Sequence, residues 1–235
     1  MKRQKPQRRG ISQRSELVYD WHEFNVNIDT REIFLGLDPL TPFEDAMVDH
    51  INSSMFIRNL VLLNSMGSGT ILVHMNMCGG DWNYGMAIHN AIQDSVKDPN
   101  ASDIVVLAYA HSRSMSSIIP QAATWRVIHP DADFLIHFGE WGYSGNYSSA
   151  MAEADWSKRS EQRMIDIYAE RCVKGPFFLG QGMEIEEVRK WLKDNIDKKE
   201  EFYMTPRQAV NYGFMDAVLG DEEFEHISVL RDKDE

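Results

Sequence analysis

The chain has little cysteine, no long apolar run and a deficit of basic charge, and each shortage excludes a class of protein. Its 235 residues include two cysteines, Cys78 and Cys172, which form neither a disulfide framework nor a zinc motif. We interpret both as free thiols in a reducing, cytoplasmic compartment. The longest clean apolar stretch, residues 104–110, is far too short to span a bilayer, so we expect no membrane partner.

Charge and composition narrow the class further. The 36 acidic side chains outnumber the 24 basic ones and give a net charge of −12, which argues against a whole-surface nucleic-acid binder. The 43% hydrophobic content is that of a globular protein with a sizeable core. No apolar segment follows the basic N-terminus, so we expect no signal peptide.

The two ends of the chain differ in composition from the middle. Six basic side chains precede the first acidic one, Glu16: Lys2, Arg3, Lys5, Arg8, Arg9 and Arg14. We therefore expect a basic flexible arm or removable propeptide over residues 1–18. A single peptidase-sized domain is expected over residues 19–220, followed by an acidic C-terminal tail over residues 221–235.

Hydrophobic periodicity alternates between strand and helix along the chain. Strands are expected at 32–36, 70–76, 104–108, 126–128 and 134–137. Helices are expected from Thr41 to about 55, around 87–96, at 114–123, 148–171 and 184–196, and from Thr205-Pro206 to Gly213, with an irregular segment at 175–182. This order predicts an α/β fold with a largely parallel sheet.

Three of the expected strands end in residues that can carry chemistry. The pair Gly79-Gly80 follows one strand, a serine-rich segment with Ser114 follows the next, and His137 closes a third. Sites in open α/β sheets form at the carboxyl ends of strands. Each signal alone also fits a plain turn, a helix cap or a core histidine. Together they fit a nucleophile, a base and backbone oxyanion donors.

The order of these motifs resembles the proteolytic subunit of the Clp protease (ClpP) and related phage-encoded serine peptidases. The similarity runs from about residue 30 to 219. The motifs that carry it are Ile33-Phe34-Leu35-Gly36, Met75-Asn76-Met77-Cys78-Gly79-Gly80, Gly85-Met86, Arg113-Ser114-Met115-Ser116, Leu135-Ile136-His137, and Ala209-Val210-Asn211-Tyr212-Gly213-Phe214-Met215-Asp216.

The resemblance implies a serine endopeptidase with a Ser-His-acid mechanism. The resemblance implies that Ser114 is the nucleophile and His137 the general base. The acid falls on Glu201, with Glu200 and Asp197 left open. The N–H groups of Gly80 and Met115 would form the oxyanion hole, and Gly79, Gly139, Trp141 and Gly142 would bind substrate.

The resemblance also implies an architecture and partners. The fold would be ClpP/crotonase-like, with repeated β-β-α-type units and a protruding helical handle at about residues 148–171. Subunits would form heptameric rings, stacked in pairs, that enclose a chamber for peptides or unfolded proteins, with an AAA+ unfoldase as partner. No metal or organic cofactor is implied, and the histidines show no ligand spacing.

Departures from the family pattern keep two other functions open. Cys78 stands where the family has proline, Ser116 where it has glycine, and His74 where an aromatic residue helps to dock the unfoldase. Residues 173–183 read as an insertion. Such divergence favours a phage or other specialised member. The alternatives are a catalytically silent ring subunit and a crotonase-type enzyme that acts on acyl-coenzyme A.

Overall fold

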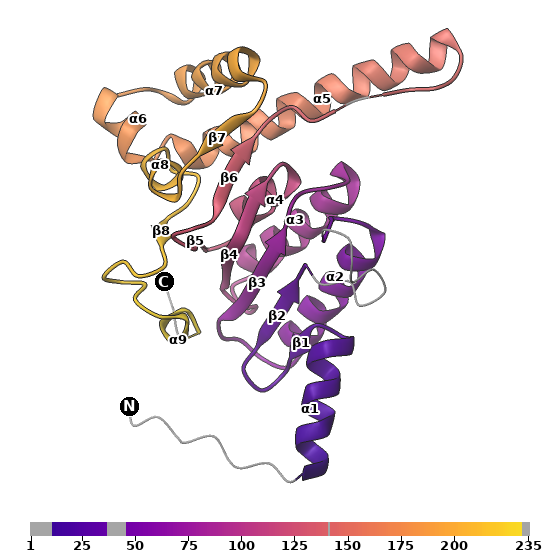
Figure 1. Ribbon diagram of the computed structural model, residues 1–235, viewed down its shortest axis with the longest axis vertical. Coiled ribbons are helices and arrows are strands. Elements are labelled where there is room, and N and C mark those ends of the chain that lie inside the picture. The colour runs from indigo at the N-terminus through magenta and orange to yellow at the C-terminus, as the bar shows by residue number, and fades with distance from the viewer. Residues whose placement is uncertain (1–10, 37–45, 141, 232–235) are drawn as a thin grey trace.

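The computed structural model describes residues 11–36, 46–140 and 142–231, and the rest of the chain lies outside the described residues (Figure 1). The strands are β1 Val26–Asn27, β2 Glu32–Leu35, β3 Ile71–Met77, β4 Ile104–Arg113, β5 Trp125–Ile128, β6 Asp133–Ile136, β7 Phe202–Met204 and β8 Ala217–Val218. The helices are α1 Ile11–Glu23, α2 His50–Ser65, α3 Trp82–Lys97, α4 Met115–Ile118, the 3-10 helix η1 Ile119–Ala122, α5 Tyr147–Cys172, α6 Pro176–Gln181, α7 Ile185–Lys199, α8 Pro206–Asn211 and α9 Ile227–Leu230.

The sheet is mostly parallel and has β4 near its centre. Its strand order is β1-β2-β3-β4-β5-β8. Strand β6 also pairs with β4, and β7 pairs with β6. The pairs from β2 to β5, β5 with β8, and β4 with β6 are parallel, whereas β1-β2 and β6-β7 are antiparallel. The units β1-β2-α2 and β5-β6-α5 each join two strands to a helix. The predicted α/β class is confirmed.

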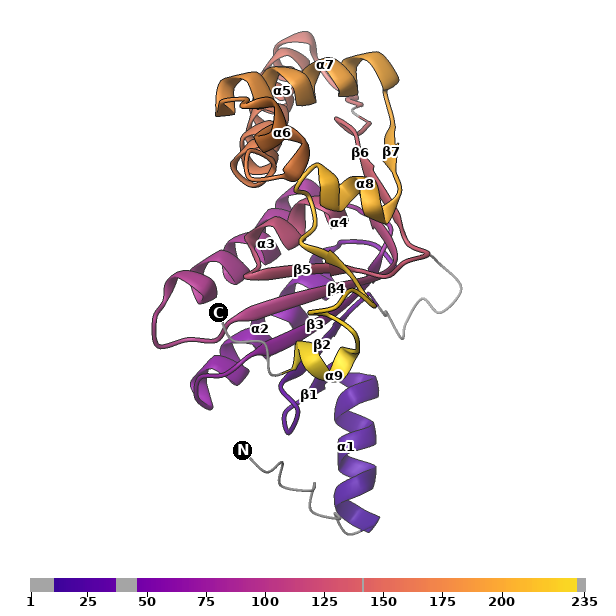
Figure 2. The ribbon, with the colours of Figure 1, turned by 90° about the vertical axis from the view of Figure 1, so that its left-hand side faces the viewer.

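Both faces of the central strands are buried, because successive side chains of a strand point to opposite faces. On β4, Ile104, Val106 and Ala108 belong to the main core under helices α2 and α3. Val105 and Leu107 face a smaller core that includes Phe224 and Leu230 from the C-terminal segment. Figure 2 shows α2 and α3 on one side of the sheet and α9 on the other.

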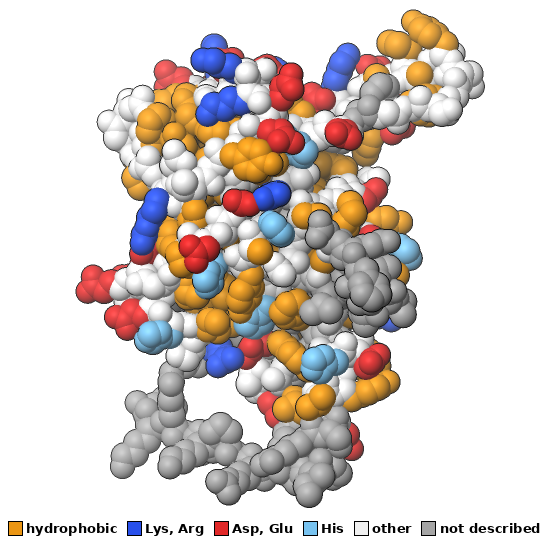
Figure 3. Space-filling view, in the orientation of Figure 1, with side chains coloured by type: hydrophobic (Ala, Val, Ile, Leu, Met, Phe, Trp, Pro, Cys, Tyr) orange, Lys and Arg blue, Asp and Glu red, His pale blue; other side chains and the backbone are white. Residues whose placement is uncertain are grey.

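Helix α5 projects from the body of the protein, as the expected handle does (Figure 1). Its buried residues begin at Met164, so the N-terminal half makes little contact with the rest of the chain. Tyr147 is 79% exposed, and Met151 and Trp156 are about half exposed. Figure 3 shows hydrophobic side chains at the free end of this helix.

The structure corrects three of the expected elements. Helix α2 begins at His50, where the Asp49 side chain accepts from the N–H of Asn52. The expected start at Thr41 lies outside the described residues, and residues 46–49, expected to be helical, are not. Residues 176–181, expected to be irregular, form α6 between a proline at its first position and Gly182 in the left-handed conformation. Strand β4 runs to Arg113, five residues beyond its expected end.

The described residues of both terminal segments include a helix, which composition does not predict. Of the expected arm, residues 1–10 lie outside the described residues, and the following ones belong to helix α1. Residues 221–231 of the expected acidic tail pack against the sheet through Phe224 and Leu230, which are nearly fully buried. Arg231 anchors this segment to Glu32, with 2.7 Å from Nε to Oε1. Within the described part of the chain, no helix has the length and apolarity needed to cross a membrane.

Candidate active site

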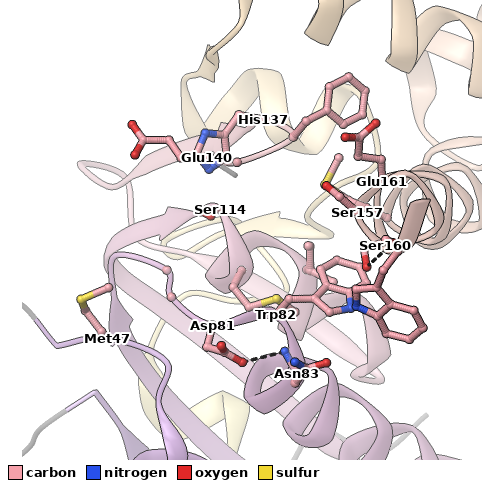
Figure 4. Close-up of a pocket in the computed structure, with 18 of the residues that line it drawn as sticks. Met47, Asp81, Trp82, Asn83, Ser114, His137, Glu140, Ser157, Ser160 and Glu161 are labelled. Atoms are coloured by element: carbon pink, nitrogen blue, oxygen red, sulfur yellow. Dashed lines mark hydrogen bonds between the residues drawn. The ribbon is translucent and has the colours of Figure 1, made fainter. Parts of the chain in front are cut away.

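Three strands deliver the candidate residues to one edge of the sheet. Strands β3, β4 and β6 are parallel neighbours, so their carboxyl ends lie together. Gly79-Gly80 follows β3, Ser114 follows β4 directly, and His137 follows β6. All of them line one cavity of about 640 Å³ with Met115 and Gly139 (Figure 4).

Ser114 occupies a strained turn between β4 and α4. Its φ of 52° and ψ of −127° are unfavourable for a residue with a Cβ. The Ser114 N–H donates to the carbonyl of Leu135 on β6 at 3.1 Å, and the Ser114 carbonyl accepts from the N–H of Ser117 at 2.9 Å. A serine held on such a strand-to-helix turn presents its hydroxyl to solvent, as nucleophilic serines do. Because β4 ends at Arg113, Ser114 is the serine at this turn.

The glycine pair fits closely against the serine and against Val48. A Cβ on Gly79 would lie 2.7 Å from Cβ of Ser114, and one on Gly80 would lie 2.4 Å from the carbonyl oxygen of Val48. Both glycines have φ in the left-handed region, at +126° and +144°. The Val48 N–H donates to the Gly79 carbonyl at 2.7 Å and fixes the loop. Only glycine therefore fits at these two positions.

His137 faces the cavity in a poorly solvated position. Burial lowers the pKa of its imidazole, and the negative charges of Glu201 and Glu140 partly oppose that effect. The Nε2 atom is buried and has no hydrogen-bond partner among the described residues. Figure 4 shows the imidazole above Ser114 and close to Glu140. Burial thus favours the neutral imidazole, which is the form that can accept a proton.

The β6-β7 pairing gives the position of Glu201, the first of the three expected acids. Ile136 pairs with Phe202 in this antiparallel ladder, so the next pair along brings Glu201 opposite His137. Glu200 ends α7 and does not affect the pKa of His137. Asp197 pairs instead with Lys193 at 2.8 Å. Of the three expected acids, Glu201 is the one whose charge reaches the imidazole.

Sequence reasoning missed Glu140 as a second carboxylate near His137. Glu140 lines the cavity, and its charge raises the pKa of His137 as that of Glu201 does. The signal was its position three residues after His137, in the loop that the resemblance assigns to substrate. Of the other expected substrate residues, Gly142 is exposed and does not line the cavity, and Trp141 lies outside the described residues.

The cavity wall is acidic and aromatic. Helices α3 and α5 contribute Trp82 and Trp156 to the wall. No lysine or arginine is among the described lining residues, whereas four carboxylates are: Asp81, Glu140, Glu153 and Glu161. No group of three or more metal-ligating side chains lies together in the described part of the chain. The cavity therefore favours a ligand with positive charge.

Fold and site together define an α/β protein with a mostly parallel sheet and a cavity at its carboxyl edge. The family model for Clp protease matches residues 29–222. The chain belongs to the Clp protease family. It is 25% identical over 209 residues to an ATP-dependent Clp protease proteolytic subunit of Deinococcus radiodurans, covering 88% of this chain and 87% of the relative. It is 27% identical over 198 residues to proteolytic subunit 3 of Streptomyces avermitilis, covering 83% and 77%.

Proposed function

We propose that the protein is a ClpP-like serine endopeptidase subunit that hydrolyses peptide bonds. The observation that carries this proposal is the meeting of Ser114, His137 and the Gly79-Gly80 loop around one cavity. Family membership supports it, because the relatives are named as proteolytic subunits.

In the proposed reaction, His137 takes the proton of the Ser114 hydroxyl as that oxygen attacks the peptide carbonyl. The tetrahedral oxyanion is bound by the N–H groups of Gly80 and Met115. Met115 is the first residue of α4, so its N–H has no acceptor within that helix. His137 then protonates the leaving amine, and water hydrolyses the acyl-enzyme.

Glu201 is the proposed acid that orients His137 and stabilises its protonated form. Its place opposite His137 across the β6-β7 ladder supports this role. Its carboxylate is not hydrogen-bonded to the imidazole in this structure, so substrate binding is expected to close the Ser114–His137–Glu201 arrangement. Catalytic hydrogen bonds are often longer before substrate binds.

The proposed assembly is a pair of stacked heptameric rings with an AAA+ unfoldase as partner. The exposed apolar residues on the projecting half of α5, Tyr147 and Met151 among them, support a contact with another subunit there. The low cysteine content, two residues in 235, supports a reducing, cytoplasmic setting. We further propose that part of residues 1–18 is removed from the mature subunit. Native mass spectrometry reports the subunit number and the mass of the mature chain together.

Cleavage of an internally quenched peptide by the purified assembly tests the proposed activity. Ser114→Ala and His137→Ala are each expected to reduce kcat at least a thousandfold, because the two side chains act as a unit. Ser116→Ala, which changes the neighbouring buried serine, is the matched control and is expected to retain activity. Cleavage that persists in Ser114→Ala would refute the proposal.

A further inference from the structure

The carbonyl of Ser114 is held by both hydrogen-bond donors of one neighbouring residue. The N–H of Ser117 lies 2.9 Å from this oxygen and the Ser117 Oγ lies 2.6 Å from it. Ser117 is fully buried, so water does not compete for either bond. The proposed nucleophile is therefore fixed through its backbone as well as through the Gly79 contact.

A tyrosine on α5 completes this chain of hydrogen bonds. The Ser117 Oγ lies 2.6 Å from the Tyr168 hydroxyl, and both side chains are fully buried. A serine hydroxyl has a single proton, which Ser117 gives to the Ser114 carbonyl. The Tyr168 hydroxyl must then be the donor to Ser117. Burial raises the pKa of Tyr168, so this phenol keeps its proton at any working pH.

The anchored carbonyl shares a peptide unit with a proposed oxyanion donor. The C=O of Ser114 and the N–H of Met115 lie in one plane and point in opposite directions, because the peptide is planar and trans. Fixing the oxygen toward Ser117 therefore sets the direction of the Met115 N–H, which points the opposite way within the same plane. The φ and ψ of Ser114 are strained, so the turn relaxes when this anchor is lost.

We propose that Tyr168 and Ser117 are positioning residues that orient the 114–115 peptide unit and couple it to helix α5. This inference rests on the proposed function, in which Ser114 is the nucleophile and Met115 an oxyanion donor. The same helix lines the cavity through Trp156 and Glu161. Its Arg171 also donates to the Gln121 carbonyl of η1 at 2.7 Å. Movement of α5 against the sheet is thereby transmitted to the reacting peptide unit.

Kinetics of covalent labelling by a fluorophosphonate test this role on the full-length assembly. Tyr168→Phe removes the hydroxyl and keeps the ring contact with Phe214, whose centroid lies 5.2 Å away. We expect the maximal labelling rate to fall about tenfold, with the half-saturating probe concentration and the pH midpoint unchanged. A variant that is merely destabilised would not lower the maximal labelling rate while leaving the half-saturating probe concentration and the pH midpoint unchanged.

Two further variants isolate the hydrogen-bond chain. Ser116→Ala removes a buried hydroxyl that has no partner among the described residues, and its labelling rate is expected to stay within twofold of the native rate. Adding Tyr168→Phe to Ser117→Ala is expected to cause no further loss, because the chain is already broken. If Ser117→Ala does not fold, the labelling rate of Tyr168→Phe alone tests the positioning role.

The outcomes separate this inference from the function on which it rests. A native assembly that labels at Ser114 while Tyr168→Phe labels equally fast overturns the positioning role and leaves the proposed function intact. Losses that multiply in the double variant also overturn it. A folded native assembly that does not label at all overturns the proposed function and the positioning role together.

Discussion

A buried carboxylate far from the cavity gives a quantitative prediction about stability. Glu32 on β2 is 4% exposed and accepts hydrogen bonds from His74 Nε2 and Arg231 Nε, both at 2.7 Å. Burial alone raises the pKa of Glu32, but these hydrogen bonds outweigh it and lower the pKa to about 2 from 4.5. The charged carboxylate therefore stabilises the folded chain and attaches the C-terminal segment to the sheet.

The size and direction of the effect follow from this shift. Moving the pKa from 4.5 to about 2 corresponds to roughly 3 kcal/mol of folding free energy at neutral pH. Because the folded-state pKa of Glu32 is the lower one, the stabilisation is complete well above pH 4.5. It is lost as the pH falls toward 2, and about half of it remains at pH 3.

Urea unfolding of Glu32→Gln at fixed protein concentration measures this contribution. We expect the variant to be about 3 kcal/mol less stable than the native chain at pH 7, with the difference roughly halved at pH 3. Glu170→Gln, an exposed site on α5, is the matched control and is expected to change stability by less than about 0.5 kcal/mol. A difference below about 1 kcal/mol at pH 7, or one that does not vary with pH, would refute the reasoning.

Three further predictions concern the cavity. Gly80→Ala places a Cβ 2.4 Å from the Val48 carbonyl oxygen and is expected to abolish most fluorophosphonate labelling. Gly180→Ala, with open space around it, is the control and is expected to label normally. Equal labelling rates for the two variants would contradict the close packing of Gly80 against Val48. The labelling rate is expected to rise with pH around a midpoint below 6.5, because burial lowers the pKa of His137; a midpoint above 6.5 would argue against His137 as the base. Peptides with lysine near the cleaved bond are expected to be cut faster than matched peptides with glutamate, because the cavity wall is acidic. The difference in rate is expected to become smaller in Glu161→Gln and in high salt. Equal rates for the two peptides would contradict a role of the acidic wall in substrate binding.

The sequence predicts best those parts of the fold where one pattern dominates. Residues 104–108 are apolar without interruption, and the structure places them in a strand that is buried on both faces. The long helix at 147–172 differs from its expected bounds by one residue at each end. At these positions local pattern and tertiary packing favour the same structure.

The wrong predictions concern segments that were judged by their average composition and not by individual residues. Residues 176–181, expected to be irregular, form a helix whose start and stop are marked by Pro176 and Gly182. The C-terminal segment was interpreted as a tail from its charge, although Phe224 and Leu230 are enough to bury it. In both cases a few specific side chains decide the structure, and an average over the segment conceals them.

The candidate site shows the limit of sequence reasoning more sharply. Ser114 and His137 could be selected from strand ends and motif order, because parallel strands bring their carboxyl ends together. Glu140 lies only three residues after His137, but its effect on the imidazole depends on the path of the loop between β6 and α5. Tyr168 comes from a distant segment, 51 residues after Ser117, and has no local signature.

The central claim is that Ser114 is an activated nucleophile, and one measurement tests it directly. The native assembly is treated with a fluorophosphonate, and its intact mass and peptide map are compared with those of Ser114→Ala. We expect one adduct per subunit, on Ser114, that is absent from the variant. A folded assembly that gains no adduct, or one that carries it on another residue, would contradict the account.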